Sequence, residues 1–359
     1  MRSRRLRFAL AAAAALGVAA PWLASCSAQF DPPSRVDGLR VLAVTVDQPY
    51  AQPGDTVHFH MTWDGGGAFA GTTPQILWLG GCFDPADDTY YGCYQQFADL
   101  LASAQGGQPV DTQYLALGPG LDHFDLTLPD TIISDHPAPA TGSRYGLAYV
   151  FFAVCAGTLG PAPANDAGGP AGNFPLACFD AQGNRIGADG FVPGFTQVYA
   201  FADGRTNANP TARGLRMKLG VDADVEYKPV ASTPEDATAV QACGLSEDAR
   251  RKLGCGSQPF STCPAYAVDL DVGANVSELD PGSRENGKFL HEAVWIDWYT
   301  DGGDFDSDVS LVYDPHQGLN ADHSVQWIAP PEKGTYSIWA VLHDARGGGS
   351  VYRGYVDVQ

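Results

Sequence analysis

Short runs in which apolar and polar residues alternate occupy most of the first 205 residues, and this is the pattern of β-strands with one buried face. Val, Phe, Met and Trp alternate with His and Thr over 57–63, and residues 123–128 repeat the pattern. A stretch rich in apolar and β-branched residues at 39–46 and apolar runs at 76–79 and 149–154 predict buried strands, and 195–201 closes the set. Only 97–103 looks helical. Residues 37–205 are therefore expected to form a β-sandwich.

The remainder of the chain repeats this organisation after a polar, turn-rich segment at 204–212. Alternating strands are expected within 266–272, 294–298 and 327–358. The predicted fold class is all-β, with two sandwiches in tandem, 37–205 and 206–359. Two insertions interrupt the pattern: a loop rich in Gly, Pro, Asn and Asp at 156–194, and a Cys-containing segment at about 234–264. The part of that segment at 234–256 predicts one or two short helices.

The N-terminus has the parts of a secretory signal. Residues 1–7 hold four arginines and no acid, and residues 8–20 are apolar. The apolar run is too short to span a bilayer as a folded anchor. The next residues, Leu23-Ala24-Ser25-Cys26, resemble a bacterial lipobox.

This resemblance implies a signal peptide at 1–25, diacylglycerol on the Cys26 thiol, cleavage before Cys26 and a tether at 26–36. Ser27, which is not the Asp that retains lipoproteins in the inner membrane, implies an outer-membrane destination in the cell envelope. The alternative is an ordinary secretory signal that is cut after Ala28. Several acyl chains hold a protein stably at a membrane.

A second resemblance concerns the end of the chain. Trp327 to Val341 reads W-x-A-P-x-x-x-G-x-Y and a strand, which Asp344-Ala345-Arg346-Gly347-Gly348 and a last alternating strand follow. This passage resembles the end of bacterial Ig-like or PKD-like surface domains, and Pro53-Gly54-Asp55-Thr56-Val57 is similar to their opening. With the lipobox, the chain resembles uncharacterised Ig-like lipoproteins of myxobacteria and related bacteria. These motifs imply a fold and no activity.

Acidic residues outnumber basic ones by 41 to 21, which gives a net charge of −20. Removal of residues 1–25, with four bases and no acid, leaves 17 − 41 = −24. Such a chain is not expected to bind nucleic acid, or to adhere to anionic lipid by charge. The expected contact with a membrane is the lipid at Cys26 alone.

The eight cysteines are expected in an oxidising compartment, where disulfides form. We predict the pairs Cys82–Cys93 and Cys155–Cys178, each of which closes a loop. Three more, Cys243, Cys255 and Cys263, are left with one bridge and one free thiol or intermolecular contact. No gap between cysteines has the spacing of a zinc site, so no metal is expected.

Three further groups of residues are candidates for binding. His58 and His60 share one strand face, as metal ligands can, but solvated side chains are the simpler interpretation. Aspartates cluster at 301–308 and at 84–88, although the spacing after Asp304 does not fit an EF-hand. Tyr90, Tyr91 and Tyr94 crowd the Cys82–Cys93 loop and its exit, where exposed rings would form a binding patch. Asp344 and Arg346 are expected to stabilise their own turn through a local ion pair or hydrogen bonds.

Hydrolase, Walker and dinucleotide-binding motifs are missing from the sequence. The sequence therefore favours a non-catalytic binding or scaffolding lipoprotein without a cofactor, whose partner is an envelope protein or a glycan. A secreted hydrolase with a site built from the inserted loops, or a Ca²⁺-stabilised adhesion module, are the alternatives.

Overall fold

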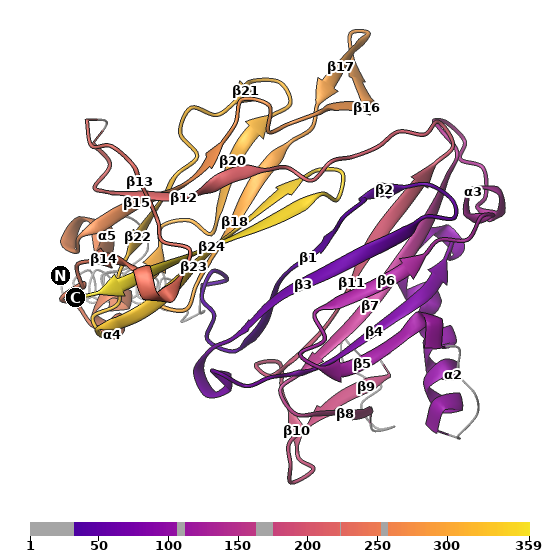
Figure 1. Cartoon of the computed structure of the whole chain (residues 1–359), viewed down its shortest axis with the longest axis horizontal. Helices are drawn as coiled ribbons and strands as arrows, with labels where there is room; N and C mark the ends of the chain where they lie inside the picture. The colour runs from indigo at the N-terminus through magenta and orange to yellow at the C-terminus, as the bar shows by residue number, and fades with distance from the viewer. Residues whose placement is uncertain (1–31, 106–111, 163–174, 223, 253–257) are drawn as a thin grey trace, which may run out of the picture.

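The computed structural model describes residues 32–105, 112–162, 175–222, 224–252 and 258–359. It is mostly β-strand, arranged in several sheets, and the two halves of the chain lie side by side along the longest axis (Figure 1). We refer to residues 37–205 as the N-terminal half and to residues 206–359 as the C-terminal half.

The N-terminal half contains both long and short strands and two α-helices within the described residues. Its strands are β1 (Leu39–Val46), β2 (Tyr50–Ala51), β3 (Thr56–Gly65), β4 (Gln75–Phe83), β5 (Leu115–Pro119), β6 (His123–Thr127), β7 (Tyr145–Cys155), β8 (Thr158–Pro161), β9 (Leu176–Phe179), β10 (Arg185–Ile186) and β11 (Phe191–Phe201). Its α-helices are α2 (Tyr94–Gln105) and α3 (Ile132–Asp135), and its 3₁₀ turns are η2 (Gly67–Phe69), η3 (Ala86–Asp88), η4 (Tyr90–Cys93) and η5 (Thr112–Tyr114).

These strands form a sandwich around a buried core. One sheet has the order β1-β3-β6 and the other has the order β2-β11-β7-β4-β5. Phe59 and Phe124 of the first sheet meet Trp78 and Phe152 of the second, and all four belong to one apolar cluster. The alternation at 57–63 predicted this arrangement, since the apolar residues of β3 up to Met61 are buried and the histidines are exposed.

The C-terminal half contains more strands. These are β12 (Ala212–Leu219), β13 (Lys228–Pro229), β14 (Thr238–Val240), β15 (Ala265–Val272), β16 (Leu279–Glu285), β17 (Lys288–His291), β18 (Val294–Thr300), β19 (Asp304–Phe305), β20 (Val309–Asp314), β21 (Gly318–Leu319), β22 (Val325–Ile328), β23 (Gly334–Asp344) and β24 (Gly349–Val358). The short helices are α4 (Glu247–Lys252) and α5 (Gln258–Thr262), with a 3₁₀ turn η7 (Pro234–Asp236).

The sheet order of the C-terminal half resembles that of the N-terminal half. One sheet is β13-β12-β15-β22-β19 and the other is β14-β24-β23-β18-β20-β21, with β16 and β17 as a separate hairpin. In both halves the last strand lies between a long antiparallel strand and a very short parallel strand, β11 between β7 and β2, and β24 between β23 and β14. Trp298 and Trp327 are fully buried between the two sheets.

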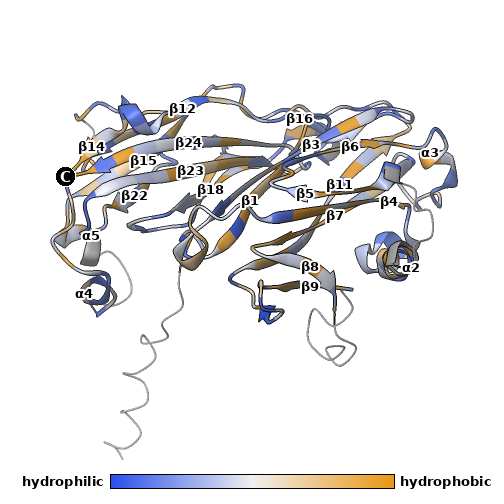
Figure 2. Cartoon of the chain, turned by 60° about the horizontal axis from the view of Figure 1, so that its bottom comes forward, coloured by the Kyte–Doolittle hydropathy of each residue, from blue (hydrophilic) through white to orange (hydrophobic). Residues whose placement is uncertain are grey.

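Both insertions contain more strand than the sequence predicts. The segment 156–194 holds β8, β9 and β10 as a three-stranded sheet, and residues 163–174 lie outside the described residues. In the segment 234–256, a 3₁₀ turn and strand β14 precede α4. The expectation of helices there was wrong for 238–240, because these residues pair with the edge of β24. The helix expected at 97–103 is present and extends over α2. In Figures 1 and 2, α2 and the pair α4 and α5 lie at opposite ends of the molecule.

A buried apolar cluster joins the two halves. Leu42 and Ala43 of β1 pack with Trp339 and Val341 of β23, and Val36 completes the cluster. Trp339 is only 1% exposed, although it lies on the face of β23 that points away from the core of its own half. The N-terminal half thus buries the part of the outer face of the larger C-terminal sheet that carries Trp339 and Val341.

Residues on both sides of this cluster add hydrogen bonds between the halves. Val36 donates its N–H to the carbonyl oxygen of Thr300 (2.9 Å), and the N–H of Thr300 donates to Ser34 (2.8 Å). In the connecting segment, Asn209 donates to the carbonyl oxygen of Val46 (2.7 Å) and accepts from the N–H of Gly349 (2.9 Å). The last three residues of the predicted tether, 34–36, therefore belong to the folded body.

Within the described residues, no helix is both long and apolar enough to cross a membrane.

Candidate functional site

The loop between β4 and α2 is closed by the disulfide Cys82–Cys93 and has a strained backbone. Asp84, Asp87 and Asp88 have φ values of 46°, 57° and 55°, in the left-handed region. Asn286 is the only other non-glycine residue with positive φ in the described part of the chain. Each such residue costs about 1–3 kcal/mol and persists only where its surroundings hold it, often at functional sites.

Strand β7 holds this loop through hydrogen bonds to two of these aspartates. The N–H of Asp84 donates to the carbonyl oxygen of Leu147, and the N–H of Leu147 donates to Oδ1 of Asp84, both at 2.8 Å. The Tyr145 hydroxyl donates to the Asp88 carboxylate, and the Tyr149 hydroxyl donates to the Asp88 carbonyl oxygen (2.9 Å). The loop is therefore fixed to the sheet by side chains as well as by its disulfide.

His136, which lies directly after α3, completes this polar cluster. Its Nε2 is 2.8 Å from Oδ1 of Asp88, and its Nδ1 is 2.7 Å from the carbonyl oxygen of Pro137. The ring is buried and lies over Tyr145, with centroids 4.3 Å apart. Because acceptors engage both ring nitrogens, neither is free to accept a proton from a substrate. This His–Asp pair therefore holds the loop in place.

These contacts shift the titration of two groups. Burial opposes ionisation of Asp88, but hydrogen bonds from Tyr145 and His136 outweigh it, and the pKa of Asp88 lies below its ordinary value. The hydrogen bond to Asp88, followed by burial, raises the pKa of Tyr145 to about 12. The carboxylate of Asp88 is thus ionised at neutral pH, and Tyr145 stays a donor.

The strained loop carries an exposed patch of three aromatic rings, Tyr90, Tyr91 and Phe195, which we call the aromatic platform. Tyr90 stacks on Phe195 of β11, with centroids 4.4 Å apart and planes at 19°. Tyr91 lies edge-on to Tyr90 at 5.6 Å. The three residues are 37%, 60% and 42% exposed. Large contiguous apolar patches often mark interaction sites, whereas single exposed apolar residues need no such explanation, so these adjoining rings are a candidate site.

Tyr94 is not part of this surface. It is half-buried and packs against Phe151 of β7, with centroids 5.9 Å apart. The sequence placed Tyr90 and Tyr91 in the platform but missed Phe195, which lies more than a hundred residues later. Residues 191–201 contain aromatic residues at several alternate positions, which predicts a strand with rings on one face but does not indicate which loop those rings meet.

The other predicted candidates are each paired within the fold. His58 lies 2.7 Å from Asp125, and this hydrogen bond raises the pKa of the exposed His58. His60 lies 3.6 Å from Asp122, and both imidazoles are on the solvent side of β3. The described residues contain no group of three or more His, Cys, Asp or Glu that could hold a metal ion.

The aspartates at 301–308 do not form one cluster in the fold, because they contact different protein groups. Asp304 pairs with Arg35 (3.1 Å) and Arg250 (2.6 Å), and Asp306 accepts from Gln326. Asp301 is half-buried, and this partial burial raises its pKa; it accepts the N–H of Ser337. The carboxylates therefore serve protein donors in different directions and do not converge as calcium ligands would.

At the turn 344–348 the predicted hydrogen bonds are formed, but the local ion pair between Asp344 and Arg346 is not. Oδ1 of Asp344 accepts the N–H groups of Arg346 and Gly348, both at 2.8 Å, so it does stabilise its own turn. The Arg346 guanidinium instead pairs with Glu292 and Glu278. Both residues are structural.

The disulfides Cys82–Cys93 and Cys155–Cys178 are formed as predicted, and Cys243 pairs with Cys263. Both Cys26, the predicted lipid attachment site, and Cys255 lie outside the described residues.

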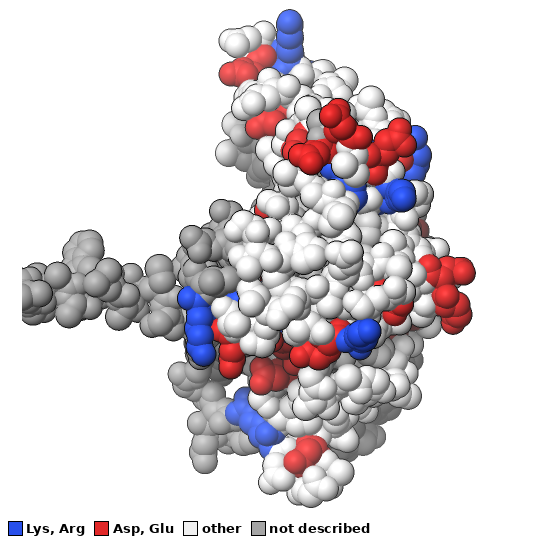
Figure 3. Space-filling view, turned by 90° about the vertical axis from the view of Figure 1, so that its left-hand side faces the viewer, with Lys and Arg blue, Asp and Glu red and all other residues white. Residues whose placement is uncertain are grey.

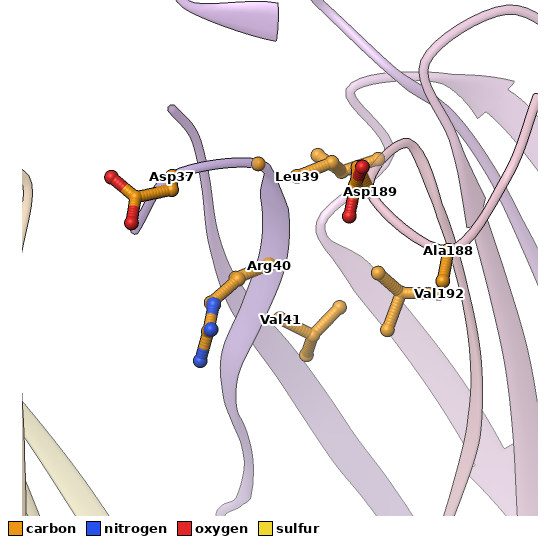
Figure 4. A pocket seen from close by; sticks show the side chains of 8 residues that line it. Asp37, Leu39, Arg40, Val41, Ala188, Asp189 and Val192 are labelled. Carbon is orange, nitrogen blue, oxygen red and sulfur yellow. The ribbon is translucent and has the colours of Figure 1, made fainter. Parts of the chain in front are cut away.

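Described residues line a groove and a smaller hollow at the surface. A groove of about 620 Å³ lies between the halves, and Thr45, His60 and Trp63 face Trp339 and Arg353 across it. A smaller hollow of about 470 Å³ lies where the sandwich of the N-terminal half is open, with Val41 of β1 and Val192 of β11 on opposite sides (Figure 4). We call the smaller one the seam pocket.

Charge is distributed unevenly along the chain. Twelve aspartates and no lysine or arginine lie between Arg40 and Arg144, and β11 adds no charge. In the view from the side of the C-terminal half, acidic and basic side chains lie around a wide uncharged area (Figure 3). Tyr90 and Tyr91 of the aromatic platform lie between Arg40 and Arg144, where the chain has no lysine or arginine.

No family model and no curated protein sequence matches this chain. Among solved structures, the fibronectin(III)-like modules of CbhA from Clostridium thermocellum align over 88% of this chain and 93% of theirs, at 10% identity and a TM-score of 0.18. Trypsin-activated alpha-2-macroglobulin from Escherichia coli aligns over 91% of this chain and 18% of its own length, at 10% identity and a TM-score of 0.20. Three N-terminal domains of the outer capsid protein Hoc of bacteriophage RB49 align over 88% and 99%, at 10% identity and a TM-score of 0.15.

Proposed function

We propose that this chain is a lipid-anchored protein of the cell envelope, built from two Ig-like sandwich domains, that binds a partner through the aromatic platform without catalysis. The exposed platform on a strained, disulfide-closed loop carries this proposal. Aromatic rings supply large contact area and lose little side-chain freedom on binding. A loop that is already fixed avoids the cost of ordering when the partner binds.

The two Ig-like domains are supported by the shared sheet order and by the short strand parallel to the last strand in each half. The apolar cluster around Trp339 and the bridging hydrogen bonds of Asn209 support a rigid pair of domains. The lipobox-like Leu23–Cys26 supports attachment through lipid at the outer membrane. In this proposal the lipid fixes the position and the rigid body presents the platform.

The hydrolase alternative lacks a supporting geometry among the described residues. The buried His136–Asp88 pair has both imidazole nitrogens engaged within the protein. Acceptors that satisfy a histidine on both sides support a structural role. The calcium-dependent alternative is likewise weakened by the arginine partners of Asp304.

Lipid attachment is tested by labelling cells with a radioactive fatty acid. The wild-type chain is expected to incorporate label and to fractionate with membranes, and Cys26→Ala is expected to lose both properties. Continued labelling of Cys26→Ala would contradict the anchor.

Binding is tested with the purified full chain and isolated envelopes. Saturable binding is expected for the wild type and for Leu117→Ala, which removes an apolar side chain of comparable exposure (50%) from β5. Tyr91→Ala is expected to lower the affinity at least tenfold. Equal binding by both variants would contradict the role of the platform.

A further inference from the structure

Strand β11, which carries Phe195, has an edge that is only partly covered. Along one side it pairs with β7 over its full length, Phe191 to Phe201. On the other side β2 pairs only with Tyr199 and Ala200. No other described strand pairs with this second edge. An edge of this kind is a template for an added strand.

The direction of the free backbone groups follows from the hydrogen bond that Tyr199 donates to the carbonyl oxygen of Pro49 (3.4 Å). The backbone groups of Tyr199 therefore point toward the side of β2, away from β7. Because backbone groups alternate along a strand, those of Gln197 and Phe195 point to the same side. Residue 193 would point there as well, but it is a proline without an N–H, as is common on edge strands.

Side chains on the same stretch are suited to hold a peptide. Phe195 projects from this stretch into the aromatic platform, so a strand added beside β11 would pass the rings of Tyr90 and Tyr91. The seam pocket lies at the start of the same strand, between Val41 and Val192. Backbone pairing together with side-chain contacts is the mode by which sheet edges recognise extended peptides.

The charge of this region selects among peptides. The loop contributes the exposed Asp87 and the adjoining helix α2 contributes the exposed Asp99, with no lysine or arginine from 82 to 143. Aromatic faces attract cations, and arginine more often than lysine. At the aromatic platform an acidic peptide would meet like charge, whereas an arginine-containing one would meet rings and carboxylates.

Building on the proposed binding function, we infer that the free edge of β11, from Pro193 to Gln197, accepts an extended, arginine-containing segment of a partner protein as an added strand. The backbone of Phe195 and Gln197 pairs with the segment, and its basic side chains lie over the aromatic platform. The partner class is therefore a basic protein segment, and the binding mode is strand addition.

The test uses the purified full chain and fluorescent seven-residue peptides in which valine alternates with either arginine or glutamate. Fluorescence anisotropy is expected to show binding of the arginine peptide only. The affinity is expected to fall at least fivefold between 50 and 300 mM NaCl, since the contact is partly ionic.

The matched variants are Gln197→Pro and Gln197→Ala. Gln197→Pro removes one outward N–H and leaves the hydrogen bonds to β7, whose donors are the neighbouring residues. It is expected to weaken the arginine peptide at least tenfold, whereas Gln197→Ala stays within twofold. Thermal unfolding of both variants shows that the sandwich is retained. If Gln197→Pro unfolds, Tyr91→Ala serves instead and is expected to weaken the peptide tenfold.

Three results would overturn the inference: no binding of the arginine peptide, equal binding of the glutamate peptide, or unchanged binding by a folded Gln197→Pro. Neutral oligosaccharides that bind in a Tyr91-dependent manner while the peptide does not would assign the platform to glycans. If the chain binds the peptide but does not incorporate lipid, the proposed lipid anchor is contradicted and the inferred strand addition at β11 is retained.

Discussion

The two halves differ in what covers the outer face of one sheet, the sheet of β7 and β11 in the N-terminal half and the sheet of β23 and β24 in the C-terminal half. In the C-terminal half the outer face of the sheet containing β23 carries Trp339 and Val341, and the N-terminal half buries both. In the N-terminal half the equivalent face carries Phe151 of β7 and Phe195 of β11 under the disulfide-closed loop and α2. There the covering stops short, and Phe195, Tyr90 and Tyr91 stay exposed.

This difference separates apolar residues whose burial stabilises the fold from apolar residues that stay exposed. Trp339 is buried because the interface between the halves needs it. The exposed rings of the platform contribute less to stability, because much of their surface remains in water. We propose that their position on a strained and multiply fixed loop serves binding, and substitutions at the interface and at the platform separate these two uses.

The largest effect is expected at the interface. Trp339→Ala should lower the free energy of unfolding by about 3–5 kcal/mol, because it removes a buried ring and leaves a cavity. Loss of this contact should also separate the unfolding of the two halves. Calorimetry is expected to show one transition for the wild type and two for the variant. A single, barely shifted transition would mean that the interface contributes little.

An intermediate effect is expected beneath the platform. Asp88→Asn removes a charged acceptor from Tyr145 and His136 and should cost about 1–3 kcal/mol at pH 7. Because the pKa of Asp88 is lowered in the folded protein, its stabilisation is present above the unfolded pKa of about 4 and disappears as the pH falls through the folded value.

Urea unfolding at several pH values measures this effect. The stability difference between wild type and Asp88→Asn should shrink below pH 4. The raised pKa values of Asp64 and Asp301 affect both proteins alike and cancel in the difference. A difference that grows toward low pH would contradict the assignment.

The smallest effect on stability is expected at the platform itself. Tyr91 is 60% exposed, so Tyr91→Ala should change the free energy of unfolding by about 0.5 kcal/mol or less. The same substitution should lower binding at least tenfold, and urea unfolding measured beside the binding assay checks both. A loss of several kcal/mol would place Tyr91 with the structural residues, as for Trp339.

Much of this protein was determined by local sequence. The alternation at 57–63 predicted strand β3 and its buried side, since side chains of a strand point alternately to its two faces. Two of the disulfides followed from cysteines that flank turn-rich loops. Strand β14 was missed because three residues form a strand only when an edge such as that of β24 is available to pair with them.

Only the tertiary structure decided which side chains stay exposed and which distant side chains contact one another. Nothing near Trp339 in sequence indicates that Leu42 and Ala43 bury it, and nothing near Tyr90 indicates that Phe195 lies against it. His136 and Asp88 likewise meet only because α3 and the loop are fixed to the same sheet. Strand patterns depend on neighbouring residues, whereas exposure and pairing depend on residues that the folded chain brings together from far apart.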